Sequence, residues 1–148
     1  MVSKKYGIGT TVNLATKAGK ASAVLCMVCM LIVPVMCIWL MMEEFTPISL
    51  VISQDRLLAN HIRNEYTIPI DAIENLTLIE ELPRSSKVNG TGMDTLSKGT
   101  FRNSNDGQFQ CMLNPRNEVF LRFEADGTVY YMSGFDDTET RAIYEALH

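Results

Sequence analysis

The stretch at residues 119–132, VFLRFEADGTVYYM, decides the fold of the C-terminal part of the chain. Apolar and polar residues alternate on both sides of Asp126–Gly127, as they do in strands that bury one face. An Asp-Gly pair between two such runs is typical of a two-residue hairpin turn, because both turn positions need a positive φ. The stretch therefore predicts an antiparallel hairpin with one face on a core.

The same alternation recurs upstream of this hairpin and predicts a sheet of about seven strands. The further runs lie at residues 48–53, 58–62, 66–70, 73–82 and 109–113. Pro69 interrupts one of them and marks an edge strand or a bend, since proline cannot donate to a sheet ladder.

The last stretch changes from strand to helix periodicity. Asp136 can cap a helix and Glu139 follows at the capping-box distance, with Ile143 and Leu147 on one face. One amphipathic helix would cover the open corner of a bent antiparallel barrel or sandwich. The expected core residues are Leu50, Ile52, Leu76, Leu78, Leu121, Phe123, Ile143 and Leu147.

Residues Ala21–Met42 form an uncharged stretch of 22 residues, ASAVLCMVCMLIVPVMCIWLMM. As a helix it is about 33 Å long, enough to cross the hydrocarbon core of a bilayer. Trp39 stands where an interfacial aromatic would, and Pro34 is expected to kink the helix. The alternative is a cleaved secretory signal, but the stretch ends in large residues, which favours a retained transmembrane anchor.

The charges that flank this stretch predict its orientation. Four lysines and no acidic residue precede it, and Glu43 and Glu44 follow it. The positive-inside rule then places residues 1–20 in the cytoplasm as a short tail and the β domain, residues 46–148, outside. A cytoplasmic domain is the alternative, because partner subunits or early folding can override the rule.

The charge of the domain narrows the class of partner. Residues 43–148 hold all 17 Asp and Glu but only nine of the 13 Lys and Arg, a formal charge of −8. Nucleic acids and anionic lipid headgroups both reward a basic surface. We therefore expect no nucleic acid and no phosphoinositide as ligand.

Cysteine and histidine usage argues against a metal site, a cofactor and an enzyme. Three of the four cysteines, Cys26, Cys29 and Cys37, share a face of the apolar stretch. They are either filler in a Met-rich helix or a seam that pairs two copies. Outside the stretch only Cys111, His61 and the terminal His148 remain, which is no metal-ligand cluster. His61 lies in a strand-like run and is better explained as a hydrogen-bonded strand histidine than as a general base.

Four short motifs resemble a known family. They are Tyr66-x-Ile68-Pro69, Leu82-Pro83-Arg84, Asn89-Gly90-Thr91-Gly92 with Lys98-Gly99-Thr100-Phe101, and Thr138-x-Thr140-x-x-x-Tyr144-x-x-Leu147. Their order resembles the bacterial pleckstrin-homology-like domains that are attached to membrane spans. The resemblance implies a barrel of bent antiparallel strands closed by a C-terminal helix, used as a binding scaffold. Phosphoinositide-binding members carry a basic cluster in the first hairpin, where this chain has only Ser53-Gln54-Asp55-Arg56.

The polar connection from Leu82 to Thr100 is the predicted binding region. Its candidate residues are Arg84, Lys87, Asn89, Gly90, Gly92 and Lys98. They suit either an anion-cradling loop or a surface loop that contacts a protein. The expected function is a non-catalytic, single-pass membrane module that binds another protein or a second copy of itself. The alternative is a sensor of lipid or of a small ligand at the membrane surface.

Overall fold

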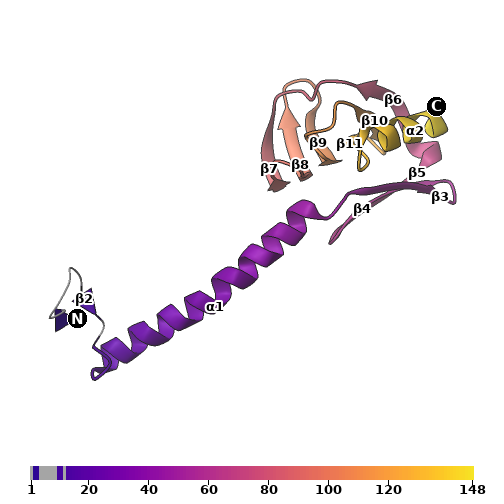
Figure 1. Ribbon diagram of the computed structural model, residues 1–148. Coiled ribbons are helices and arrows are strands. Elements are labelled where there is room, and N and C mark those ends of the chain that lie inside the picture. The colour runs from indigo at the N-terminus through magenta and orange to yellow at the C-terminus, as the bar shows by residue number, and fades with distance from the viewer. Residues whose placement is uncertain (1, 4–9, 12) are drawn as a thin grey trace. The chain divides into compact units, whose positions relative to one another are not determined.

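A computed structural model describes residues 2–3, 10–11 and 13–148 (Figure 1). The chain divides into two compact units, Met1–Met42 and Glu43–His148.

The first unit contains a strand pair and most of one long helix. Strands β1 (Val2–Ser3) and β2 (Thr10–Thr11) pair antiparallel. Helix α1 (Lys17–Phe45) begins where the Thr16 hydroxyl accepts the Gly19 N–H at 3.0 Å, as an N-cap does. It contains Ala21, Pro34, Trp39 and Met42, and its mean hydropathy reaches 2.8. The predicted apolar helix is confirmed, and it is long and apolar enough to cross a membrane.

The smaller sheet of the second unit is an antiparallel meander of β3 (Ser49–Ser53), β4 (Arg56–His61) and β5 (Asn64–Pro69). Gln54 and Asp55 have φ of 49° and 60°, so the first turn is a tight hairpin turn. Pro69 ends β5, an edge strand, and a short 3-10 turn, η1 (Ile70–Ala72), follows. The prediction for Pro69 is confirmed.

The register of this meander corrects one expectation. The run expected at residues 58–62 is out of step with the strand, because Leu57 and Ala59 are the buried apolar residues of β4. The tight turn sets this register, because it pairs Ile52 with Leu57 and Leu50 with Ala59. Directly paired residues share a face of the sheet, so Ala59 follows Leu50 into the core.

The larger sheet has the order β6-β10-β11-β9-β8-β7. Its strands are β6 (Ile73–Ile79), β7 (Ser85–Gly92), β8 (Ser97–Asn103), β9 (Gly107–Leu113), β10 (Phe120–Ala125) and β11 (Thr128–Met132). All neighbours are antiparallel except β9 and β11. The predicted hairpin at 119–132 is confirmed, with Asp126 and Gly127 at φ of 49° and 71°.

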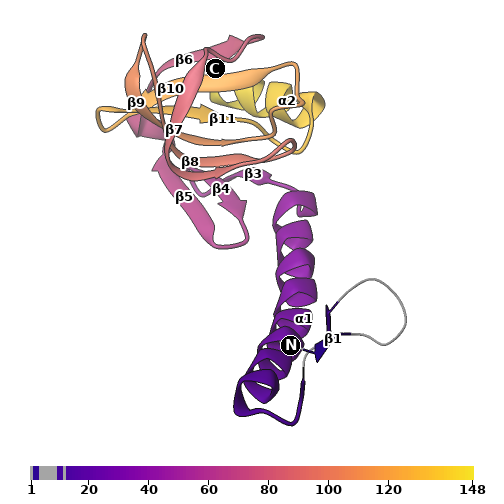
Figure 2. The same cartoon turned by 90° about the vertical axis from the view of Figure 1, so that its left-hand side faces the viewer.

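This six-stranded sheet must curl. Strands β6 and β7 are its two edges, yet only residues 80–84 join them. Five strand spacings in a flat sheet would separate the edges by about 24 Å. The six Cα steps from Ile79 to Ser85 span at most about 21 Å. Figure 2 shows β3, β4 and β5 as a separate layer below the curled sheet.

Two apolar clusters cover the two faces of the curled sheet. One combines the three-stranded sheet, one face of the larger sheet and helix α2 (Asp137–Leu147). The other lies on the opposite face and contains Phe101, Phe109, Cys111, Leu113, Phe120 and Tyr131. Of the expected core, Leu50, Leu121 and Phe123 are buried, and Ile52, Leu76, Leu78, Ile143 and Leu147 are partly buried against the first cluster.

The C-terminal helix starts as predicted. The Asp136 carboxylate accepts the Glu139 N–H at 2.8 Å, and Glu139 accepts the Phe135 N–H at 2.5 Å. The expected class, mainly β with an N-terminal apolar helix and a closing helix, is confirmed. Its β part has nine strands in two sheets, a sandwich without a closed barrel within the second unit.

Candidate functional site

The predicted binding residues at 84–98 lie mainly on a β-hairpin and not on a loop. Strands β7 and β8 pair antiparallel through this segment, with Gly90 opposite Gly99. Both glycines have a positive φ, 134° and 112°. A Cβ on Gly99 would lie 2.5 Å from the Asn89 carbonyl oxygen, so the two backbones approach too closely for any other residue. The glycines serve the strand pairing here.

Strand β7 is an open edge of the sheet. It pairs with β8 alone, and residues 84–90 are all exposed. Arg84 and Lys87 are therefore accessible cations. The register skips Val88, which is 51% exposed and forms a bulge between Lys87 and Asn89.

A polar cavity of about 310 Å³ lies between β5 and the β7–β9 strands. Three of the six predicted residues line it, namely Asn89, Gly90 and Lys98, whereas Arg84, Lys87 and Gly92 do not. The residues on the opposite side of this cavity were not among the predicted binding residues. There the Gln110 side-chain oxygen accepts the hydroxyls of Tyr66, at 3.2 Å, and Thr100, at 3.3 Å. Burial raises the pKa of Tyr66, so this phenol stays a hydrogen-bond donor.

Lys98 differs from the expectation of an accessible binding cation. It is 4% exposed and forms an ion pair with Glu43, which is 7% exposed and belongs to the last turn of α1. Its Nζ also lies 3.2 Å from Nδ1 of His61. Lys98 is therefore part of a buried network that we call the Glu43–Lys98–His61 cluster.

His61 completes this cluster in its neutral form. Nδ1 accepts from the Lys98 ammonium, which leaves the Nε2–H to donate to the Thr46 carbonyl at 3.0 Å. Burial lowers the pKa of His61, and the neighbouring charge of Lys98 lowers it further. Both ring nitrogens are engaged, so His61 has the geometry of a structural strand histidine.

The cluster connects the last turn of α1 with strands β4 and β8 through its ion pair and hydrogen bond. The Thr95 hydroxyl adds a hydrogen bond of 2.9 Å to the Glu44 carbonyl. The second carboxylate oxygen of Glu43, Oε2, is buried and lacks a hydrogen-bond partner. Glu43 and Lys98 are 55 positions apart, so no local pattern could have predicted their contact.

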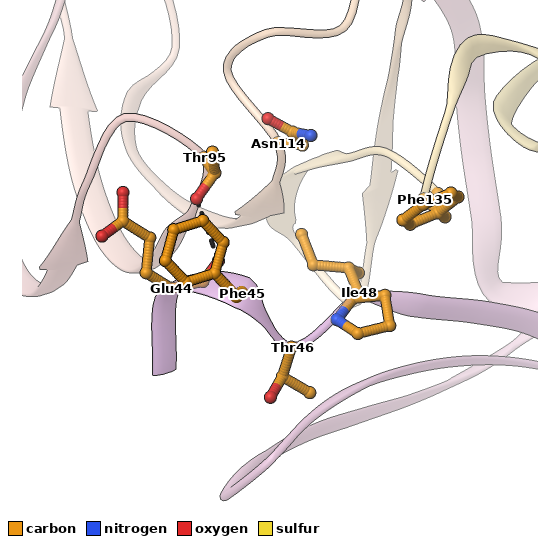
Figure 3. Close-up of a pocket in the computed structure, with 9 residues that line it drawn as sticks. Glu44, Phe45, Thr46, Ile48, Thr95, Asn114 and Phe135 are labelled. Carbon is orange, nitrogen blue, oxygen red and sulfur yellow. Dashed lines mark hydrogen bonds between the residues drawn. The ribbon is translucent and has the colours of Figure 1, made fainter. Parts of the chain in front are cut away.

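A second pocket, of about 170 Å³, lies beside the hydrogen bond between Thr95 and Glu44 (Figure 3). Phe45 contributes from the end of α1, Pro47 and Ile48 from the chain that follows it, and Phe135 from the loop before α2. Phe45 and Phe135 remain 68% and 62% exposed. Sequence reasoning missed Phe135, for which the only signal is a single aromatic residue between Gly134 and Asp136.

Asp106 is the centre of a third polar group. Its two oxygens accept from Arg122 and Tyr131 at 2.5 Å and from Asn103 at 3.0 Å. Burial alone would raise the pKa of Asp106, but hydrogen bonds from Tyr131, Arg122 and Asn103 outweigh it and lower the pKa. Both oxygens are engaged, which is the pattern of a structural network.

Cys111 lies in a small apolar pocket on the same face of the sheet as Tyr131. Its thiol donates to the Ser97 carbonyl at 3.3 Å. Burial raises the pKa of this thiol to about 12. Since the thiolate is the reactive form, Cys111 is a packing residue.

Comparison of the chain with protein-family models, with curated proteins and with solved structures finds no significant match.

Proposed function

We propose that this chain is a membrane-anchored, non-catalytic binding module of the bacterial pleckstrin-homology-like type. Its partner is an extended, acidic segment of another protein, which pairs with β7 as an added strand. The observation that carries the proposal is the open edge of β7, a strand of eight residues that pairs on one side only. Main-chain hydrogen bonds along such an edge provide affinity, and alternate side chains provide specificity.

The charge of the hairpin supports an acidic partner. From Leu82 to Asn103 the chain has four cations and one acidic residue, Asp94, although the unit as a whole is acidic. Three of these cations, Arg84, Lys87 and Arg102, are exposed. Two copies of β7 placed edge to edge would bring Lys87 and Arg84 near their own kind, which disfavours self-pairing. The edge therefore fits a different chain better than a second copy.

The polar groups elsewhere support a binding role over catalysis. Both nitrogens of His61 and both oxygens of Asp106 are engaged in hydrogen bonds within the fold. A general base needs a free position toward its substrate. These two groups therefore act within the structure.

A charge-reversal experiment tests the partner surface. The full chain in nanodiscs would be titrated with extended eight-residue peptides that carry Glu at alternate positions, and amide exchange in β7 would be measured. Binding should slow exchange along β7, and Arg84→Glu with Lys87→Glu should weaken it about tenfold at low salt. The matched control is Arg116→Glu with Arg141→Glu, two exposed sites away from β7. Equal binding by both double variants, or protection outside β7, would contradict the proposal.

The hydropathy of α1 supports the membrane anchor, and the flanking charges support an N-terminus in the cytoplasm. Ser86 is exposed on β7, so Ser86→Cys offers a reporter thiol of the second unit. A membrane-impermeant thiol reagent should label this variant in intact cells. Labelling only after lysis would place the domain in the cytoplasm instead.

A further inference from the structure

Phe45 and Phe135 are the two most exposed large apolar side chains of the second unit. They are 90 positions apart in the sequence, yet they line the same pocket (Figure 3). Ile48 and Pro47 line the pocket with them. The two rings thus line one pocket, together with the polar residues Glu44, Thr46, Thr95 and Asn114.

The position of Phe45 in the chain keeps this residue close to the uncharged stretch. Met42 is the last residue of the uncharged stretch, and α1 continues without a break to Phe45. Three further residues add about 4.5 Å along a helix axis. The headgroup layer of a bilayer extends several ångströms beyond the hydrocarbon core on each side. Phe45 therefore lies within the headgroup layer if Ala21–Met42 fills the core.

Phe135 is held out by its neighbours and is not simply part of a loose loop. Its N–H donates to Glu139 at 2.5 Å, and the Gly134 N–H donates to the Thr140 hydroxyl at 3.0 Å. The two acidic residues that follow Phe135 both accept hydrogen bonds from backbone N–H groups of the fold. Asp136 caps α2, and Asp137 accepts the N–H groups of residues 118 and 119. A loop held by these hydrogen bonds thus presents one aromatic ring to solvent.

We propose that Phe45 and Phe135 insert together into the headgroup–acyl boundary of the membrane that α1 spans. This second attachment to lipid would fix how the binding edge is presented above the bilayer. Aromatic rings are enriched at this depth because they are apolar bodies that tolerate the polar boundary. The −8 charge of residues 43–148 makes a zwitterionic surface the matching one. The inference rests on the proposed membrane anchoring.

Quenching by brominated lipid tests the insertion in the full chain. The protein is placed in phosphatidylcholine nanodiscs whose acyl chains are brominated near the headgroup. Phe135→Trp is made together with Trp39→Phe, so that the indole at position 135 is the only one. Val88→Trp in the same background is the matched control, because Val88 is 51% exposed on the β7 edge. The indole at position 135 should lose fluorescence to a degree comparable with native Trp39, and its emission should shift to shorter wavelength relative to the control.

Each other outcome overturns the inference in a distinct way. Quenching at position 135 no greater than at position 88 would refute lipid contact while leaving the anchor intact. Shielding from aqueous iodide without quenching by lipid would show that a second protein copy covers the surface. Absence of quenching at Trp39 in the unmodified chain would refute the anchor itself, and the inference with it.

Discussion

Replacing Lys98 by methionine tests the Glu43–Lys98–His61 cluster directly. Methionine keeps most of the volume of lysine but leaves the buried Glu43 carboxylate without its counter-charge. Glu43 already has one buried oxygen without a partner, so the substitution leaves both oxygens without their main interaction. Breaking a buried pair in this way costs about 3–5 kcal/mol. That is a large fraction of the 5–15 kcal/mol by which a domain is typically stable.

The double substitution Lys98→Met with Glu43→Met separates the lost pair from the loss of packing. It removes both charges together, which is commonly neutral or even stabilising in a buried site. We therefore expect the double variant to recover most of the free energy of unfolding that Lys98→Met loses. Lys87→Met makes the same chemical change at an exposed site and should change the stability by less than about 0.5 kcal/mol.

Urea unfolding of the full chain in detergent micelles, followed by circular dichroism of the β-sheet, measures these differences. A loss for Lys98→Met no larger than for Lys87→Met would show that water reaches Glu43. A double variant as unstable as Lys98→Met would show that the lysine stem stabilises the fold by packing, with the ion pair contributing little. Either result would refute the reasoning above.

Three further predictions follow from groups described above. The pKa of Asp106 is lower in the folded chain than its ordinary value of 3.8, so the stability that this carboxylate contributes is present above that value and is lost as the pH falls through the folded pKa. Asp106→Asn should therefore flatten the fall in unfolding free energy below about pH 4, as an acid titration followed by circular dichroism would show. Cys111, with a pKa of about 12, should resist a thiol reagent until the chain is unfolded, whereas a cysteine introduced at Ser86 should react at once, as mass spectrometry would show. Gly99→Ala should cost more than the roughly 1 kcal/mol expected of Gly107→Ala, since both have a positive φ but only Gly99 faces a backbone oxygen, and thermal melting of the two variants compares them.

Elements with a strong local signal were predictable from the sequence. The hairpin around Asp126–Gly127 combines alternation with a specific turn pair, and α2 begins with an acidic cap. Helix α1 needs only its uninterrupted apolar composition. In each case the residues that determine the element lie within the element.

The β7–β8 hairpin was missed because its sequence lacks the usual strand pattern. Strand β7 has one apolar residue, Val88, and lies at an exposed edge with no second face to bury. Gly90 and Gly99 suggest a loop when read singly. Only their pairing across the ladder shows that they permit close approach of two strands.

The Glu43–Lys98–His61 cluster and the pocket beside it could not be predicted, because their contacts join residues that are far apart in the sequence. Lys98 had the features of a free cation in a polar segment until the fold placed it beside Glu43 and His61. Phe135 becomes a candidate site residue only because the fold places it on the same pocket as Phe45. Burial and long-range pairing, which single-sequence patterns do not carry, decide the role of both residues.

The short connection at residues 80–84 also limits how this sheet can grow. Fibre formation by edge-to-edge pairing needs two open edges that face away from each other, so that each copy can add the next. Here the same five residues tie β6 to β7 and keep the edges of one sheet close at one end. A strand of the proposed partner would pair with β7 between Gly92 and Ser85, the residue at which the connection enters the strand. The fold can thus keep an open edge for one partner strand while opposing uncontrolled polymerisation.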